Sequence, residues 1–356
     1  MAKIKREKYD IPVIGITGSV GKTSTKDTIA QVVGKKYNVY KTQGNYNNRL
    51  GVALTILGLK DHNALVAEMG MNHLGEISEL TKIIRPTICV ISNIGTSHIG
   101  NLGSRENILK AKLEILDGMN EQGKIIINND NDLLHKWNTE DKKYNKITFG
   151  IENKSDYMAE NIDIQEKCNT FTYNGDKVET NKAGIPFVYN ALSAIAIGEN
   201  LEIPKEDIID ALKNVEFTEN RMDIEKINNI TFIKDYYNAS YESIKPSLEY
   251  LSQIKDGLKI AILGDVKELG EFSKELHEKI GEEVAKNKID ILITVGEDAK
   301  YIAKKAIEKG NQKVYSFDSN EEAAEKIKEY NSEKATILLK ASHSMNFGEI
   351  LNIYKK

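Results

Sequence analysis

Hydrophobic and polar residues succeed one another along the chain in blocks that predict alternating strands and helices. In the first half, short apolar runs with the character of buried strands lie at 11–16, 37–40, 64–69, 87–92 and 124–128. Stretches with helical spacing follow them at 22–34, 50–57, 75–84, from Ser104 to about Gly118, and from Val188 to Asn200. A short alternating region at 145–180 predicts a small antiparallel excursion, and residues 1–10 read as a polar lead-in. Strand–helix alternation of this kind predicts a parallel α/β sheet.

A second alternation begins near residue 217 and continues to the end of the chain. Its strands are expected at 230–234, 259–263, 290–294, 313–316 and 335–339, and its helices at 242–252, 273–286, 297–308, 320–330 and 344–354. At 356 residues the chain is long enough for more than one core. We therefore predict two α/β domains, at 1–216 and 217–356, of which the second is an open, Rossmann-like domain without a glycine-rich loop.

The turn after the first predicted strand carries the residues of a phosphate-binding loop. Thr17 to Gly21 form a tight, glycine-containing loop, and a helix begins at Lys22. Loop and helix N–H groups bind anions, a lysine neutralises phosphate charge, and the Thr23 hydroxyl is a Mg²⁺ ligand. The usual pattern has glycine where Ile16 stands, so a plain glycine turn with a surface lysine is the alternative. The expected nucleotide-binding residues here are Gly18, Ser19, Val20, Gly21, Lys22, Thr23 and Ser24, which defines a P-loop ATPase domain.

Two further residues suited to metal binding follow predicted strands. Glu68 closes a buried strand, and His98 lies just beyond the next one. Since parallel strands present their ligands at the carboxyl edge of the sheet, we expect both near Thr23, holding Mg²⁺. A buried Glu68 should also have a cationic partner. The alternatives are an exposed glutamate on an edge strand and a structural histidine. The amides of Asn45, Asn47 and Asn48 are either turn and cap formers or contacts to a polar substrate.

Composition narrows the class of protein. The net charge of −4 and the lack of a basic block argue against nucleic-acid binding. Cys89 and Cys168 are far apart, which excludes a disulfide framework and is consistent with a cytoplasmic protein. The charged N-terminus does not resemble a signal peptide, and no apolar run is long enough to insert in a membrane.

Several longer motifs occur in the order found in one family. They are Gly15–Thr23, Gly44–Asn48, Glu68–Gly70, Asn93–His98, Ala111–Glu114, Asp235–Asn238, Leu263–Gly270 with His277, and Lys340–Ser342. Together they resemble the Mur ligases, most closely the MurF type. The resemblance implies ATP-dependent amide-bond formation through an acyl phosphate. It also implies the joining of D-alanyl-D-alanine to a UDP-linked muramoyl tripeptide, a step of peptidoglycan precursor synthesis.

The resemblance assigns roles to individual residues. The catalytic set is Lys22, His98, Lys112 and Arg221, with Lys112 as the lysine that is carbamylated in the family. Two Mg²⁺ ions are implied, one at Thr23 and Glu68 and the other at His98 and the Lys112 carbamate. Asn190 matches the asparagine that reads adenine, Asp235 an acid that contacts the nucleotide, and Arg221 an arginine that reaches the γ-phosphate.

The resemblance also implies a set of substrate-facing residues, for which the local sequence gives less independent evidence. They are Asn45, Asn47, Asn48, Tyr237, Asn238, Lys340 and Ser342. For Lys340 and Ser342, a lysine at a strand end and a helix cap are equal alternatives. The expected partners are small molecules only, the nucleotide-linked acceptor and the amine, and we expect a monomer.

The sequence also departs from the family pattern. A MurF enzyme ordinarily begins with a further domain that grips UDP, whereas here the phosphate-loop strand begins at Ile11. Pro186 and Phe187 replace residues near the adenine contact, Lys234 stands where the family has an acid, and Arg49 replaces an acid after the Asn-Asn pair. Two alternatives therefore remain: a ligase for a different carboxylate acceptor without UDP, and a non-catalytic nucleotide-binding paralogue.

Overall fold

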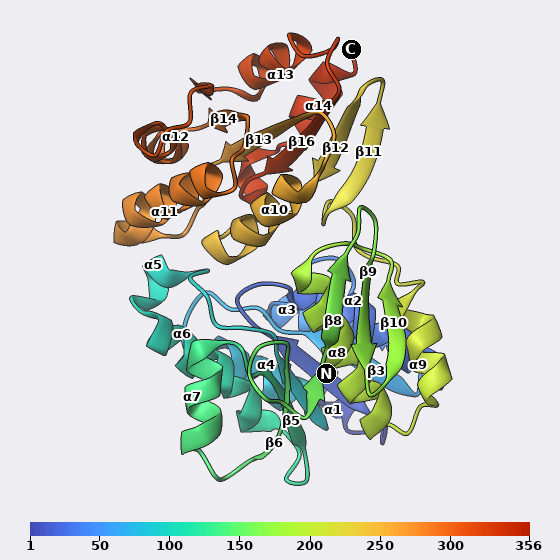
Figure 1. Ribbon diagram of the computed structural model, residues 1–356. Coiled ribbons are helices and arrows are strands. Elements are labelled where there is room, and N and C mark those ends of the chain that lie inside the picture. The colour runs from blue at the N-terminus through green and yellow to red at the C-terminus, as the bar shows by residue number, and fades with distance from the viewer. The chain divides into compact units, whose positions relative to one another are not determined.

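A computed structural model describes residues 1–356, and the chain divides into two compact units (Figure 1). Unit 1 comprises Met1–Gly95 and Leu102–Thr218, and unit 2 comprises Thr96–Asn101 and Glu219–Lys356. Both units are α/β, which confirms the predicted fold class. The boundaries 1–216 and 217–356 stay a prediction for the extent of the two domains. No helix combines the length and the apolar character needed to cross a membrane.

The centre of unit 1 is a seven-stranded sheet in the order β2-β3-β1-β4-β5-β6-β7, in which every neighbouring pair is parallel. Its strands are β1 (Val13–Thr17), β2 (Val39–Lys41), β3 (Ala64–Glu68), β4 (Ile88–Ile91), β5 (Lys124–Asn128), β6 (Asn145–Gly150) and β7 (Tyr157–Met158). The middle strands are buried throughout, so they appear in the sequence as unbroken apolar runs. Ile16 pairs with Glu68 and Thr17 with Ile91, so β1, β3 and β4 end at one edge.

Helices cover this sheet, and α2 and α8 pack together within an apolar core. The helices are α1 (Ala2–Arg6), α2 (Lys22–Val33), α3 (Arg49–Gly58), α4 (Glu76–Ile84), α6 (Arg105–Leu113), α7 (Asp132–Glu140), α8 (Ile185–Asn200) and α9 (Lys205–Leu212), with a 3₁₀ turn at Glu114–Gly118. Residues 99–101 of the short helix α5 (Ile99–Leu102) belong to unit 2. The polar lead-in prediction was wrong, because residues 2–6 form a helix whose Arg6 is buried and donates to the Ile84 carbonyl at 2.7 Å. Ser104 caps α6 as expected, accepting from Asn107 N–H.

The antiparallel excursion is smaller than its predicted extent. It contains β8 (Glu160–Ile164), β9 (Asn169–Tyr173) and β10 (Asp176–Thr180) in the order β10-β9-β8. Asn174 and Gly175 both have positive φ in the β9–β10 turn, the backbone that two-residue hairpins favour. Residues 145–158 instead extend the parallel sheet as β6 and β7, because their strands continue its register next to β5.

Unit 2 is built on a six-stranded sheet in the order β11-β12-β16-β13-β14-β15, with only the β11–β12 pair antiparallel. The strands are β11 (Asp223–Ile227), β12 (Ile230–Lys234), β13 (Leu258–Gly264), β14 (Ile291–Val295), β15 (Val314–Phe317) and β16 (Ala335–Lys340). The helices are α10 (Tyr241–Gln253), α11 (Ser273–Lys286), α12 (Ala299–Glu308), α13 (Asn320–Lys328) and α14 (Gly348–Tyr354), with 3₁₀ turns at Gly270–Phe272 and His343–Met345. The predicted alternation is confirmed; β11, a charged hairpin strand, is an addition to it.

Candidate active site

The loop between β1 and α2 has the backbone that an anion site requires. Gly18 has φ +149°, and a Cβ there would lie 2.0 Å from the Ser92 hydroxyl oxygen, so only glycine fits. Gly21 caps the twelve-residue helix α2 in the left-handed region, with φ +82°. The first N–H groups of a helix have no intrahelical acceptors and carry partial positive charge. The loop therefore presents a site for phosphate at the start of α2.

A second segment, Ser92 to Gly95, supports this loop. The Asn93 carbonyl and side-chain oxygens accept from Ser19 N–H at 3.0 Å and Val20 N–H at 2.9 Å. The Ser92 hydroxyl donates to the Val20 carbonyl at 2.6 Å, and Gly95 N–H donates to the Ser19 hydroxyl at 2.9 Å. Sequence reasoning missed this role for Asn93. The available signal was an amide residue directly after a strand that neighbours β1.

Lys22 lies folded over the phosphate loop. Its ammonium donates to the carbonyls of Gly18 at 2.9 Å and Ser19 at 3.2 Å. These are neutral acceptors at the place where an anion meets the helix N-terminus. An ammonium with three rotatable donors exchanges such carbonyls for phosphate oxygens without a change in backbone.

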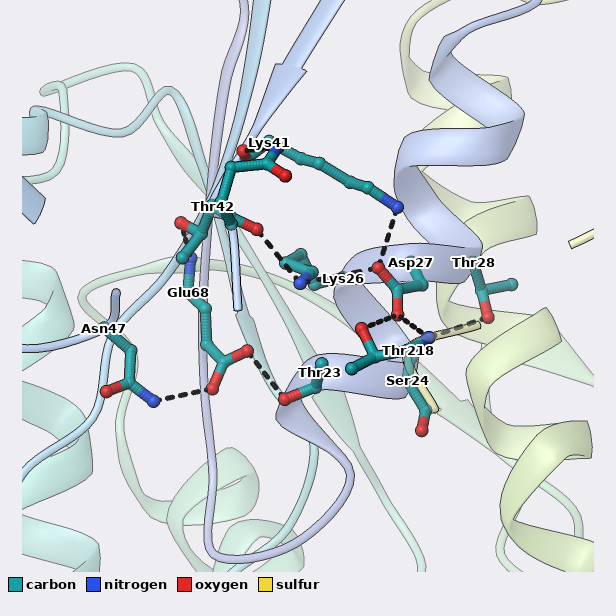
Figure 2. A network of polar contacts seen from close by, with 11 residues as sticks. Thr23, Ser24, Lys26, Asp27, Thr28, Lys41, Thr42, Asn47, Glu68 and Thr218 are labelled. Carbon is teal, nitrogen blue, oxygen red and sulfur yellow. Dashed lines mark hydrogen bonds and ion pairs between the residues drawn. The ribbon is translucent and has the colours of Figure 1, made fainter. Parts of the chain in front are cut away.

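Thr23 and Glu68 come together as the sequence predicts (Figure 2). The Thr23 hydroxyl donates to the Glu68 carboxylate at 2.9 Å, and Asn47 Nδ2 donates to its other oxygen at 2.8 Å. Glu68 is only 2% exposed. Two neutral donors therefore hold this buried carboxylate, and the cationic partner expected from the sequence stays a prediction. Hydroxyl and amide groups satisfy its lone pairs without an ion pair.

The donor set near Thr23 suits Mg²⁺ better than a metal enclosed by protein ligands. No group of three or more His, Cys, Asp and Glu side chains that could hold a metal ion occurs in the structure. One buried carboxylate beside a threonine hydroxyl remains, at the phosphate loop. Mg²⁺ commonly takes one or two protein oxygens and completes its shell with phosphate and water. The residues present thus fit Mg²⁺ bound together with a nucleotide.

Lys112 is the most unusual side chain of unit 1. It lies on α6, is 0% exposed, and its Nζ has no hydrogen-bond partner. Burial first, and then the positive charge of Lys22, lower the pKa of Lys112 well below its usual value, against the opposite influence of Glu68. A buried ammonium without a partner is costly, so the structure favours a neutral amine here. An uncharged, unpartnered amine is also a nucleophile.

The structure gives the asparagines of the 44–48 loop different contacts. Asn48 is a helix cap, because its side chain accepts from Gly51 N–H at 2.9 Å at the start of α3. Asn47 instead turns to Glu68, and its carbonyl accepts from Gly70 N–H at 2.8 Å. Asn45 is exposed, and its carbonyl accepts from Asn47 N–H. Contacts of these three residues to a substrate stay a prediction.

Asn190 is buried on α8 beside the phosphate-loop helix. Its Oδ1 accepts from the Thr25 hydroxyl at 2.9 Å, one turn after Gly21. Ser24, also buried, accepts from the Thr28 hydroxyl through its carbonyl oxygen. These contacts place Asn190 near the phosphate loop, and its role toward adenine stays a prediction.

His98 groups with unit 2, although it follows β4. Residues 96–101 pack with that unit, where Gly100 N–H donates to the Glu268 carbonyl at 3.1 Å. His98 has φ +65°, and its Nδ1 lies 2.6 Å from the Glu268 carboxylate. A carboxylate on one ring nitrogen leaves Nε2 to face other groups. A role for His98 at a metal stays a prediction.

Asp235 and Lys340 form an ion pair in unit 2, in which the lysine is buried and the carboxylate is partly buried. Lys340 ends β16, is 2% exposed, and its Nζ lies 2.6 Å from the Asp235 carboxylate. The same Nζ donates to the carbonyls of Asp235 at 3.2 Å and Asn238 at 3.4 Å, and Ser247 donates to the carboxylate at 2.8 Å. The lysine at a strand end that the sequence offered as an alternative is thus a fixed, fully paired group.

Arg221, Ser342 and His277 are further residues of unit 2 that the sequence motifs single out. The Arg221 guanidinium lies over the Tyr237 ring, 4.0 Å from its centroid, a cation–π arrangement. Ser342 stands at the cap position of the 3₁₀ turn 343–345, but its hydroxyl accepts from Lys267 N–H at 2.9 Å. His277 is buried, with Nε2 accepting from Val266 N–H at 3.0 Å and Nδ1 donating to the Ser273 carbonyl at 2.7 Å.

Comparison with known proteins agrees with this geometry. Residues 16–198 match the Mur ligase middle domain, and residues 220–343 match the Mur ligase glutamate ligase domain. The chain is 36% identical to UDP-N-acetylmuramoyl-tripeptide–D-alanyl-D-alanine ligase of Bacillus subtilis, over 99% of this chain and 77% of that protein. A crystal structure of MurF from Acinetobacter baumannii superposes with TM-score 0.92 at 30% identity, covering 100% of this chain and 79% of the other.

A further solved structure adds a nucleotide to the comparison. The MurF ligase of Thermotoga maritima in complex with ADP superposes with TM-score 0.89 at 27% identity, covering 99% of this chain and 82% of that one. A two-unit α/β fold with a P-loop and a strand-end carboxylate defines an ATP-handling ligase core. The chain belongs to the Mur ligase family, and within it the relatives named above are of the MurF type.

Proposed function

We propose that this protein is an ATP-dependent ligase that joins D-alanyl-D-alanine to UDP-N-acetylmuramoyl tripeptide in peptidoglycan synthesis. The names of its relatives support the substrates. The observation that carries the proposal is the combination of a phosphate loop, the Thr23–Glu68 pair and the buried, unpartnered Lys112. A protein that only bound nucleotide would have no physical need for the last of these.

The residues of the phosphate loop prepare ATP for attack at its γ-phosphate. Phosphoryl transfer depends mainly on positioning and on neutralising charge. The N–H groups at the start of α2 hold the phosphate chain, and Lys22 moves from the Gly18 and Ser19 carbonyls to phosphate oxygens. The acceptor carboxylate then forms an acyl phosphate and ADP leaves. The amine of the dipeptide attacks the acyl carbon, an amide bond forms, and phosphate leaves.

Thr23 and Glu68 are the residues that would hold a Mg²⁺ ion at this site, and His98 with a carbamate on Lys112 would hold a second. Bound Mg²⁺ neutralises the charge that develops on the phosphates. Asn47 keeps the Glu68 carboxylate in place from its other oxygen. The hydroxyl of Thr23 is already aimed at Glu68, so both ligands are set before any ion binds.

A carbamate on Lys112 accounts for the burial of this side chain. The neutral amine attacks the carbon of CO₂, a new N–C bond forms, and the nitrogen loses a proton. The product is an anion in place of an orphaned amine. Because burial and Lys22 already lower the pKa of Lys112, the reactive neutral form is the one that the fold supplies.

Roles for the other predicted residues follow the same model. We expect Asn190 to contact adenine, Asp235 the nucleotide, and Arg221 the γ-phosphate. The substrate-facing set is Asn45, Asn47, Asn48, Tyr237, Asn238, Lys340 and Ser342. Of these, Lys340 would act through Asp235 and Asn238, because its ammonium is occupied by them. We expect the enzyme to work as a monomer.

The test is phosphate release from ATP and Mg²⁺, with D-alanyl-D-alanine and UDP-N-acetylmuramoyl tripeptide supplied singly and together, and the product identified by mass. Release that requires both substrates, with a joined product, is expected. Lys22→Ala should abolish it, whereas Lys142→Ala, at an exposed lysine of unit 1, should not. Phosphate release that ignores the dipeptide, or joining to another carboxylate in preference, would contradict the proposed substrates.

A further inference from the structure

Asp27 is a buried carboxylate on α2 that the phosphate chemistry does not use. It lies one turn after Lys22 and Thr23, and its side chain is 0% exposed. Its Oδ1 lies 2.8 Å from Lys41 Nζ and 3.4 Å from Lys26 Nζ. Burial alone would raise the pKa of Asp27, but the charges and hydrogen bonds of the lysines outweigh it, and the pKa is lowered. Asp27 is thus an anion with cations on one side.

The other carboxylate oxygen of Asp27 holds Thr218. Oδ2 accepts from both the backbone N–H and the hydroxyl of Thr218, each at 2.9 Å, across 191 residues of sequence (Figure 2). Thr218 is the last residue of unit 1 before the chain passes to unit 2 at Glu219. Helix α2, which begins at the phosphate loop, therefore also fixes Thr218, where the linker to unit 2 begins.

Neighbouring residues fix the same segment to unit 1. The Phe217 ring packs edge-on against Phe187 of α8, with centroids 5.2 Å apart. Asn181 Nδ2 donates to the Val215 carbonyl at 2.9 Å. Of these attachments, the Asp27 contact is the last one before the chain leaves the unit. It therefore determines where the chain leaves unit 1.

The same network reaches the predicted metal ligand. Lys26, fully buried beside Asp27, donates to the Thr42 carbonyl at 3.0 Å. The Thr42 hydroxyl accepts from Glu68 N–H at 3.0 Å. Glu68 and Thr218 are therefore joined by one run of buried polar contacts through Thr42, Lys26 and Asp27, as Figure 2 shows.

We propose that Asp27 is a positioning residue for ligation, which anchors the linker to the phosphate-loop helix through Thr218. This role rests on the proposed function, because it concerns the ligation step. Arg221 follows Thr218 by three positions, so the anchor sets the starting point of the segment that carries it. Binding of nucleotide by the loop itself does not depend on the anchor.

The decisive variant is Asp27→Asn, because asparagine keeps the shape and loses the charge. One end of its amide is an acceptor and the other is a donor. Lys26 and Lys41 demand the acceptor, so the NH₂ group faces the N–H and the hydroxyl of Thr218. The lysines keep a neutral acceptor in place of the ion pairs. The Thr218 N–H loses its acceptor, and the Thr218 hydroxyl stays bonded only by accepting from the NH₂ group. Thr218→Val breaks only the hydroxyl contact, and Thr218→Ser retains it.

Ligation and nucleotide binding are measured separately on the full chain. Asp27→Asn should lower kcat for ligation about tenfold, the effect of losing hydrogen bonds to a charged group, with the Kd for ADP changed less than about twofold. Thr218→Val should show a smaller loss of kcat, and Thr218→Ser should restore it. Thr139→Val, a surface threonine bonded only within its own helix, is the control and should have no effect.

Hydrogen exchange separates this proposal from the proposed function. The Thr218 amide should exchange faster in Asp27→Asn, whether or not the protein ligates these substrates. Equal exchange in variant and wild type would overturn the anchor. A kcat loss matched by an equal loss of ADP affinity, or wild-type kcat in Asp27→Asn, would overturn its role in ligation. A wild type without dipeptide-dependent turnover would instead refute the substrate assignment and leave the exchange result standing.

Discussion

Lys112 of unit 1 and Lys340 of unit 2 are both buried completely, and the two lysines have opposite surroundings. Lys340 of unit 2 has a carboxylate at 2.6 Å and two carbonyls within reach. Lys112 of unit 1 has no hydrogen-bond partner at its Nζ, and its pKa is lowered by burial and by Lys22. A buried charge that has partners can be explained by a structural role, whereas a buried amine without partners points to a chemical role. The comparison separates a structural lysine from a chemical one without reference to sequence position.

The largest expected effect is the loss of activity in Lys112→Met. If Lys112 carries a group that neutralises charge in phosphoryl transfer, ligation should fall by about a thousandfold. Stability toward denaturant should stay equal or rise, because an orphaned amine is removed. Lys110→Met, an exposed lysine on the same helix, is the matched control. Normal ligation by Lys112→Met would remove the distinction between the two lysines.

Lys340→Met should act on stability instead. It leaves the Asp235 carboxylate without its cation, which costs about 3 kcal/mol of unfolding free energy. Chemical denaturation measures the loss. Adding Asp235→Asn in the same chain should recover part of it, because the uncompensated charge is gone. If the single variant were as stable as wild type, the pair would not be structural.

Removal of CO₂ tests the chemical role of Lys112 without changing any residue. Protein equilibrated in degassed buffer should lose activity severalfold, and bicarbonate should restore it, since a lysine carbamate forms and breaks reversibly. Phosphate release under the two conditions is the measurement. The Lys112→Met variant must show no response to bicarbonate; a response there would place the effect elsewhere in the chain.

His277 provides an intermediate case with a smaller effect. It is buried and uncharged, as we infer for Lys112, but both ring nitrogens are hydrogen-bonded, as the ammonium of Lys340 is. Burial lowers its pKa below the usual 6.5, against the raising influence of Ser273 and Asp298. The unfolded chain therefore binds more protons below pH 6.5, and stability should decline as the pH falls from there toward the folded pKa.

Denaturation midpoints between pH 7 and pH 5 measure the His277 contribution, which we expect to be smaller than the stability loss in Lys340→Met. His277→Gln should flatten this part of the pH profile. His135, an exposed histidine of unit 1, gives the control variant His135→Gln, which should leave the profile unchanged. An unaltered pH profile in His277→Gln would show that this ring titrates alike in both states.

The fold followed from the sequence because its strands are buried on both faces. Such strands appear as short apolar runs, and β1, β3, β4 and β5 were recognised in this way. The charged N-terminal helix α1 was not, because its short amphipathic pattern is hidden among lysines.

The local part of the site was predictable for a similar reason. Glycine spacing and strand ends indicated the phosphate loop and the Thr23–Glu68 pair. Contacts that join distant segments were not predictable, because no local rule pairs Asp27 with Thr218 or Lys340 with Asp235. The support given by Asn93 to the phosphate loop is of the same kind, since it depends on two strands being neighbours.

The edge strand β11 of the unit 2 sheet is built in a way that disfavours aggregation. Strand β11 is only five residues long and is bounded by Met222 and Asn228, both with positive φ. Glu225 at its centre pairs with Lys234 and Lys355. A short, charged edge between two sharp bends gives another chain little to add a strand to. This margin therefore protects the protein from joining its copies into β-linked aggregates.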